Sequence, residues 1–86
     1  MNSFAPRYWM HETAGVLRPV IEAYLSGRVL NDAEIGIMRA YLHQWVTLGD
    51  WGQDVSELAA AVAGIRTRED VERCIAELDD CGMDPL

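Results

Sequence analysis

The sequence predicts an all-α fold: a small single-domain bundle of about four helices with a packed N-terminal arm. The chain has 86 residues, enough for one hydrophobic core and too few for two. Half of the residues are apolar and 24% are charged, which is typical of a globular protein. Apolar residues recur at spacings of three and four, and no segment alternates as a strand does. We therefore expect residues 1–86 to form a single helical domain.

The N-terminal part of the chain is expected to hold an aperiodic arm and then the first helix. Residues 1–12 show no clear period, but their aromatic side chains would be costly to leave in water, so this arm should pack on the bundle. The first helix is expected over about residues 18–26, because Pro19 suits a first turn and Gly27 can end it. Whether residues 13–17 add a turn is left open. The predicted inward face consists of Val20, Ile21, Tyr24 and Leu25.

The second helix has the clearest signals. Asn31 is expected to cap it, and Glu34 stands three residues later, where its side chain can complete a capping box. The apolar stripe that follows covers about half of the helix circumference, which indicates a central helix with neighbours on two sides. Its members are Ile35, Ile37, Met38, Tyr41, Leu42, Trp45, Val46 and Leu48. Trp51, in the loop beyond, is expected to close one end of the bundle.

The third helix is predicted to begin at Asp54 and to end at Gly64. Glu57 stands three residues after Asp54, which is the spacing of a capping box, and glycine often ends a helix. The side chains expected to face inward are Val55, Leu58, Ala59 and Val62.

The fourth helix is predicted to begin at Thr67, with Asp70 three residues later, and to stop at Gly82. Its expected buried stripe is Val71, Cys74, Ile75, Leu78 and Cys81. The two cysteines lie seven residues apart on one helix, so their Cα atoms are about 10 Å apart. A disulfide needs about 4.4–6.8 Å, and we interpret both thiols as buried apolar side chains.

Negative charge is concentrated in the C-terminal half of the chain. The net charge is −7, and residues 1–48 contribute nothing to it because four arginines balance four acids. Residues 49–86 hold three arginines against ten acids. A surface with this sign favours basic partners and disfavours the phosphate backbone of nucleic acids.

The acids form a stripe along the outward side of the expected fourth helix. The predicted partner-binding residues are Glu69, Glu72, Arg73, Glu77, Asp79, Asp80 and Asp84. Asp79 and Asp80 lie in the last turn and Asp84 lies just beyond it, where negative charge opposes the helix dipole. An unfavourable local arrangement of this kind indicates a function. The alternative is an ordinary solvated face, in which Arg73 pairs with the glutamates about one turn before and after it.

The sequence holds no convincing catalytic or metal-binding set. His43 has no positioned nucleophile, and the spacings of Cys74, Cys81, His11 and His43 match no familiar zinc pattern. No glycine-rich phosphate loop is present. We therefore expect a protein that is not an enzyme and that needs no metal and no cofactor.

The sequence also favours a cytoplasmic protein without membrane contact. The longest apolar run, residues 58–65, is far shorter than a bilayer requires. The first residues lack the charged-then-apolar order of a signal peptide.

The segment ELAAAVAGIRTREDVERCIAEL, residues 57–78, resembles a DNA-binding helix-turn-helix. It has an alanine-rich first helix, Gly64 in the turn, and inward Val71 and Ile75 in the second helix. The resemblance implies that the second helix would enter the major groove. The acidic outward face of that helix would instead be repelled by phosphates, so direct binding of nucleic acid is the third hypothesis and not the expected one.

The favoured function is a non-enzymatic, acidic protein-binding module. Its sharper form is an inhibitor that docks the acidic helix on a basic surface of a nucleic-acid-binding complex, by analogy with phage-encoded anti-CRISPR and anti-restriction proteins. The alternative is a self-associating structural or regulatory subunit, because the broad apolar face of the second helix can exceed what one small core hides. That alternative predicts a homodimer.

Overall fold

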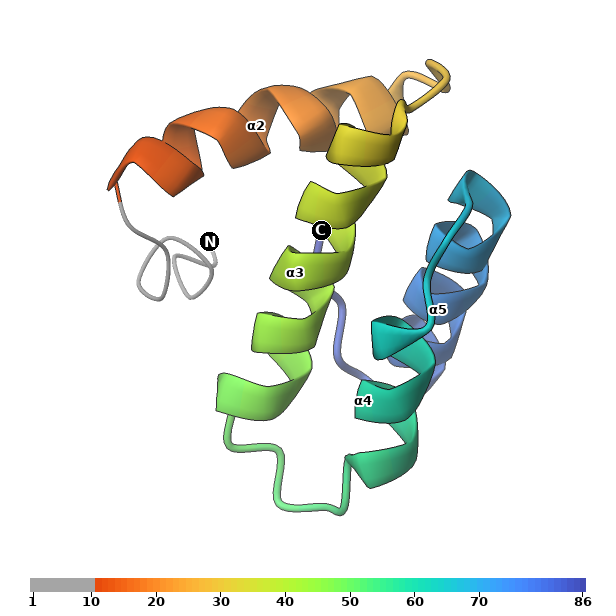
Figure 1. Ribbon diagram of the computed structural model, residues 1–86. Coiled ribbons are helices and arrows are strands. Elements are labelled where there is room, and N and C mark those ends of the chain that lie inside the picture. Colours follow the sequence, from red (N-terminus) through yellow and green to blue (C-terminus); the bar gives the residue numbers. More distant parts are fainter. Residues whose placement is uncertain (1–10) are drawn as a thin grey trace.

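The computed structural model describes residues 11–86, with side chains from residue 15 onward, and within that range it forms four helices and no strand (Figure 1). The helices are α2 (His11–Leu25), α3 (Asp32–Leu48), α4 (Ser56–Ala63) and α5 (Arg68–Asp80). Helix α3 is central and contacts each of the other three. The predicted all-α class is confirmed. The predicted packing of residues 1–10 of the arm lies outside the described residues.

Helix α2 begins earlier than the sequence predicted. It starts at His11, so residues 13–17 are helical, and Pro19 lies inside the helix rather than in its first turn. An interior proline removes one backbone hydrogen bond. Burial of Leu17, Val20 and Ala23 in the core offsets that loss, and this packing is not visible in the local sequence. Leu25, expected to face inward, is 65% exposed.

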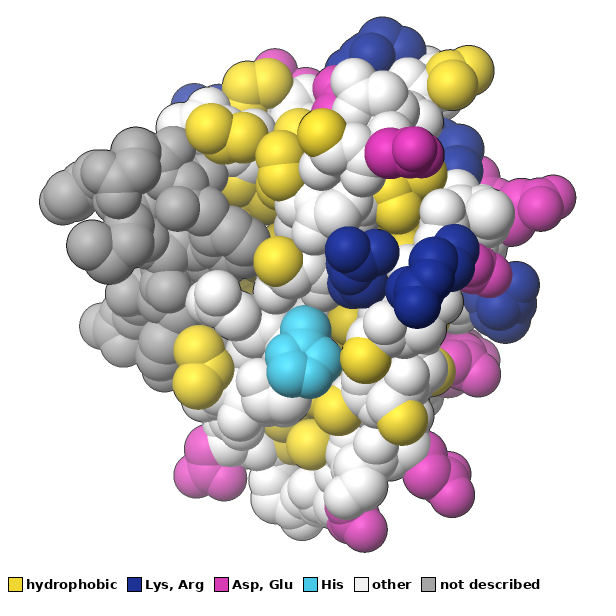
Figure 2. All heavy atoms as spheres, viewed as in Figure 1, with side chains coloured by type: hydrophobic (Ala, Val, Ile, Leu, Met, Phe, Trp, Pro, Cys, Tyr) yellow, Lys and Arg dark blue, Asp and Glu magenta, His cyan; other side chains and the backbone are white. Residues whose placement is uncertain are grey.

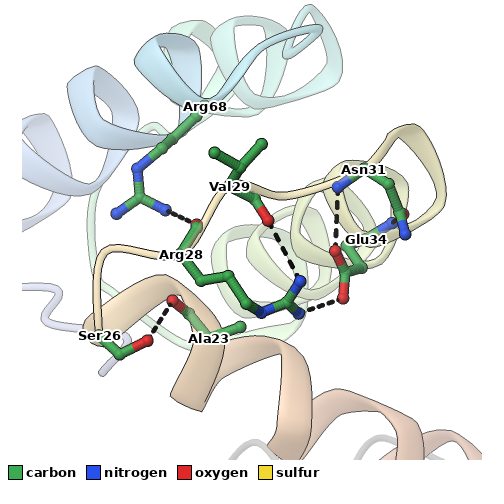
Figure 3. Close-up of polar contacts among 7 residues, drawn as sticks. All are labelled: Ala23, Ser26, Arg28, Val29, Asn31, Glu34 and Arg68. Carbon is green, nitrogen blue, oxygen red and sulfur yellow. Dashed lines mark hydrogen bonds and ion pairs between the residues drawn. The ribbon is translucent and has the colours of Figure 1, made fainter.

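The end of α2 is tied to the start of α5 by one arginine. Gly27 has a φ of +84° and begins the turn toward α3. The guanidinium of Arg68 donates to the carbonyl oxygens of Tyr24 (2.8 Å) and Arg28 (3.0 Å), the second of which is drawn in Figure 3. The same group lies 4.5 Å from the centre of the Tyr24 ring, which is cation–π distance. A single side chain thus joins segments that are 40 or more residues apart.

The predicted capping box of α3 is confirmed. The Asn31 side chain accepts from the Glu34 N–H at 2.8 Å, and the Glu34 carboxylate accepts from the Asn31 N–H at 2.9 Å (Figure 3). The guanidinium of Arg28 binds the second Glu34 oxygen and the carbonyl of Val29. The hydrogen bond from Arg28, with that from the Asn31 backbone, lowers the pKa of Glu34 below its ordinary value.

Helix α4 starts at Ser56 and not at Asp54. The Asp54 carboxylate accepts hydrogen bonds from the N–H of Ser56 at 2.9 Å and from its hydroxyl at 2.7 Å. The bond to the backbone two residues later is that of an Asx turn. Val55 therefore occupies the cap position, which has no side-chain cap hydrogen bond, and the predicted box with Glu57 does not form. The short reach of aspartate favours the local turn over the cap. The end of the helix at Gly64 agrees with the prediction.

Trp51 covers the C-terminal end of α3. Its indole N–H donates to the carbonyl oxygens of Trp45 (3.2 Å) and Val46 (3.1 Å), two groups that a helix end leaves without helical partners. The centre of its ring lies 5.6 Å from the centre of the Trp45 ring. Gly49 allows this approach, because a Cβ atom there would lie 2.6 Å from the indole.

The capping box of α5 is also confirmed, but its C-terminus differs from the prediction. Thr67 and Asp70 exchange hydrogen bonds at the helix start. At the other end the helix stops at Asp80, so Cys81 lies outside it and is exposed rather than buried. Gly82 adopts a φ of +77°, and Met83 turns inward to become 1% exposed. The sequence prediction extended the helical period one residue too far.

The C-terminal tail is held against α3. The N–H of Met83 donates to the carbonyl of Leu78 at 2.8 Å, and both side chains are buried, as in a Schellman motif. The indole of Trp45 donates to the carbonyl of Met83 at 3.0 Å, and the hydroxyl of Tyr41 donates to that of Pro85. The tail therefore completes the core although it has no helical structure.

Candidate functional site

All seven residues of the predicted stripe are exposed. Six lie on α5 and one lies in the tail, and their side chains face away from the core formed with α3 and α4. They are Glu69, Glu72, Arg73, Glu77, Asp79, Asp80 and Asp84. Their exposure agrees with the helical spacing.

The arginines neutralise only the first half of this stripe. Arg68 pairs with Glu72 at 3.1 Å, and Arg73 pairs with Asp70 at 2.9 Å. The expected pairs of Arg73 with Glu69 and Glu77 are therefore absent. Asp70 stands three residues before Arg73, a spacing that places both side chains on one face of the helix. Arg73 therefore pairs with Asp70 and not with either glutamate.

In the described part of the chain, the second half of the stripe is not paired with a cation. Glu77, Asp79 and Asp80 form no ion pair with any residue in the range 15–86, and the last turn of α5 holds no basic residue. Asp79 and Asp80 stand at the negative end of the helix dipole. In the tail, Asp84 accepts a hydrogen bond from the N–H of Leu86 at 3.1 Å, which leaves its charge uncompensated.

An open hollow of about 550 Å³ adjoins this uncompensated half. It lies between α4 with its preceding loop and the end of α5, and it combines three carboxylates with a small apolar floor and a thiol. Its lining residues are Gln53, Asp54, Glu57, Leu58, Ala61, Glu77 and Cys81. Sequence reasoning missed Asp54 and Glu57 as members of the acidic site. They stand 20 or more residues before Glu77, and only the α4–α5 packing brings them next to it.

Hydrogen bonds fix Asp54 at the hollow and Asp70 at the start of α5. The Asp70 carboxylate accepts from the N–H of Arg66 at 2.9 Å and from Arg73, and these bonds lower the pKa of that carboxyl. The hydroxyl and N–H of Ser56 lower the pKa of Asp54 in the same way. These hydrogen bonds favour the charged form of both carboxyl groups.

The other candidate residues do not converge. His43 and Cys81 are exposed on different elements, whereas Cys74 is buried and burial raises the pKa of its thiol. Both cysteines are free. Among the described residues, no three histidine, cysteine or acidic side chains are placed to hold a metal ion. The side chain of His11 lies outside the described part of the chain.

The segment that resembles a helix-turn-helix forms α4, a four-residue turn (residues 64–67) and α5. The outward acids of α5, including Glu69 and Glu72, are exposed. Comparisons of the chain with protein-family models, with curated proteins and with solved structures found no match. None of the helices in residues 11–86 has both the length and the apolar character needed to cross a membrane.

Proposed function

We propose that this protein is a non-enzymatic binding module whose acidic surface docks on a basic surface of a partner protein. The acidic surface consists of Asp54, Glu57, Glu77, Asp79, Asp80 and Asp84. One observation carries the proposal: these exposed carboxylates gather at one end of the α4–α5 pair, and no arginine in the described range compensates them. Glu72 and Arg73, which form ion pairs, and Glu69, which forms none within residues 15–86, extend the surface toward the start of α5.

The exposed carboxylates repel one another, and a basic partner relieves this repulsion. Like charges held close together disfavour the folded chain, and cationic groups of a partner remove that penalty on binding. Complementary charge also accelerates association and selects against other acidic surfaces. At 0.1 M salt, charges are screened over a distance of about 10 Å. We therefore expect binding to weaken as the salt concentration rises.

The hollow fits the side chain of an arginine or lysine from such a partner. Its lining offers Leu58 and Ala61 to the methylene groups and Glu57 and Glu77 to the cationic head. Long basic side chains commonly bury their stems in this manner and keep the charge at a polar rim. The arrangement favours a basic protein surface over a basic small molecule, because the acids continue along α5 beyond the hollow.

The sharper form of the proposal is inhibition. A basic protein surface that carries arginines and lysines in a groove is commonly a nucleic-acid-binding surface. An acidic module docked there would exclude the nucleic acid, as phage-encoded anti-CRISPR proteins do. Addition of duplex DNA should then displace the captured partner, and a partner that binds both simultaneously would restrict the proposal to simple docking.

The experiment compares capture of the partner by three forms of the protein. The first is the natural chain, and the second carries the reversals Glu77→Arg, Asp79→Arg and Asp80→Arg. The third carries three reversals at exposed acids that are not members of the acidic surface, Glu22→Arg, Asp32→Arg and Asp50→Arg. All forms are immobilised, and bound proteins are identified by mass spectrometry.

The proposal predicts a partner that the natural chain and the third form retain and the second form loses. The third form has the same net charge as the second, so a general charge effect would weaken both equally. Equal recovery of the partner by the second form would contradict the proposal. Circular dichroism of all three forms checks that each is folded.

A further inference from the structure

Two arginines outside the acidic surface converge on one backbone oxygen. Arg39 on α3 donates to the carbonyl of Ile65 at 2.9 Å, and Arg66 in the α4–α5 turn donates to the same oxygen at 3.1 Å. We call these two side chains the arginine pair. Figure 2 shows dark blue side chains side by side near the middle of one face, with a histidine close by and no acidic side chain between them.

The arginine pair differs from the neighbouring arginines because neither guanidinium forms an ion pair within residues 15–86. Arg28, Arg68 and Arg73 each form one. This is unexpected in a chain of net charge −7, in which acids outnumber arginines two to one. Each guanidinium has five N–H groups and uses one here, so the remaining donors stay available for a ligand.

Only one of the two hydrogen bonds to the Ile65 carbonyl helps to hold the fold together. The bond from Arg39 joins α3 to the turn after α4, across 26 residues, and so contributes to the fold. The bond from Arg66 reaches the preceding residue and joins no separate elements. The donors at the start of α5 do not belong to this site, because the Asp70 carboxylate already accepts from the N–H groups of Arg66 and Thr67.

We propose that the arginine pair binds a phosphate group, as a phosphate monoester or as inorganic phosphate. Guanidinium groups present forked N–H donors that match the spacing of phosphate oxygens. A phosphate monoester carries about −1.5 to −2 charges at pH 7, which matches two adjacent cations, whereas a carboxylate would neutralise only one. The site is independent of the acidic surface, so either proposal can fail without the other.

The test is a titration at pH 7.5 and constant ionic strength. Binding is monitored through the NMR signals of the arginine Nε–Hε groups. The probes are inorganic phosphate and phenyl phosphate, with acetate as the monoanionic control. We expect saturable shifts at Arg39 and Arg66 with both phosphates and none with acetate. Tighter binding of phenyl phosphate would assign an ester as the source, and equal binding would assign free phosphate.

Variants separate this site from general charge effects. Arg66→Gln should weaken phosphate binding about tenfold or more, the range of one charge-assisted hydrogen bond, and leave the fold unchanged. Arg18→Gln removes the same charge from an exposed position on α2 and should bind as the natural chain does. Arg39→Gln tests the second member and reports any loss of stability through its melting temperature. Linear shifts without saturation, equal shifts with acetate, or unchanged binding by Arg66→Gln would each overturn the proposal.

Discussion

The buried hydroxyl of Tyr41 holds the C-terminal tail against α3. The residue is 2% exposed, and its hydroxyl donates to the carbonyl of Pro85 in the tail. Burial, with a smaller contribution from the charge of Asp84, raises the pKa of Tyr41 to about 12. A phenol in this position is therefore both an anchor for the tail and a group that resists ionisation.

The substitution Tyr41→Phe should lower the free energy of unfolding by about 1 kcal/mol at pH 7, the net value of a typical hydrogen bond. Urea denaturation followed by circular dichroism measures this loss. Tyr24→Phe is the matched control, because that ring keeps its contact with Arg68 and its hydroxyl donates no hydrogen bond to any residue in the range 15–86. A loss for Tyr24→Phe as large as that for Tyr41→Phe would contradict the anchoring role.

Alkaline pH should reduce the difference between the natural chain and Tyr41→Phe. The folded pKa of about 12 lies above the ordinary value of 10.0, so the folded state holds the phenolic proton more tightly than the unfolded state does. This stabilisation is complete below about pH 10 and is lost as the pH rises toward 12. Between pH 8 and pH 11.5 the unfolding free energy should fall more steeply for the natural chain than for Tyr41→Phe, and parallel curves would contradict the assignment.

At the scale of helices, the capping boxes of α3 and α5 were predictable, whereas the start of α4 and the effects of tertiary packing were not. Both Asn31 and Thr67 cap their helices as predicted, because capping boxes involve residues three apart in sequence. The interior position of Pro19 depends on packing against α3. The exposure of Cys81 depends on where Gly82 turns the chain. Local sequence patterns could reveal neither the interior position of Pro19 nor the exposure of Cys81.

Two glycine-to-alanine substitutions should change stability in opposite directions. Gly15 lies inside α2, and a Cβ atom added there would meet no atom of the described residues within 4 Å, so Gly15→Ala should stabilise the protein by about 0.5–1 kcal/mol. Gly82 has a φ of +77°, and Gly82→Ala should destabilise it by about 1–2 kcal/mol. Thermal or urea denaturation measures both, and equal signs would contradict the assigned backbone conformations.

At the scale of the whole molecule, charge is segregated. The exposed acids of the acidic surface, which form no ion pair within the described range, gather around the end of α5, whereas the arginine pair stands apart from them on α3 and the α4–α5 turn. The sequence identified the α5 part of this pattern, because helical spacing is local. It did not identify the contribution of α4 or the convergence of Arg39 and Arg66, since both depend on how distant helices pack.

Removal of charge at the end of α5 should separate stability from binding. Asp79→Asn and Asp80→Asn each remove a negative charge from the unfavourable end of the helix dipole and should stabilise the protein by about 0.3–1 kcal/mol at low salt. Glu69→Gln, in the first turn, should have the opposite effect. Denaturation at low and at high salt measures these changes, which should shrink as the salt concentration rises. Stabilised variants that also lose the partner would show that the acids are kept for binding.

The close approach of Trp45 and Trp51 gives the protein an intrinsic optical signal. Their rings are 5.6 Å apart and inclined by 53°, a geometry in which two indole chromophores couple and contribute to near-ultraviolet circular dichroism. That signal depends on fixed side-chain packing and vanishes when packing loosens, even where helices persist. The pair therefore distinguishes a properly packed variant from one that is merely helical, without any added label.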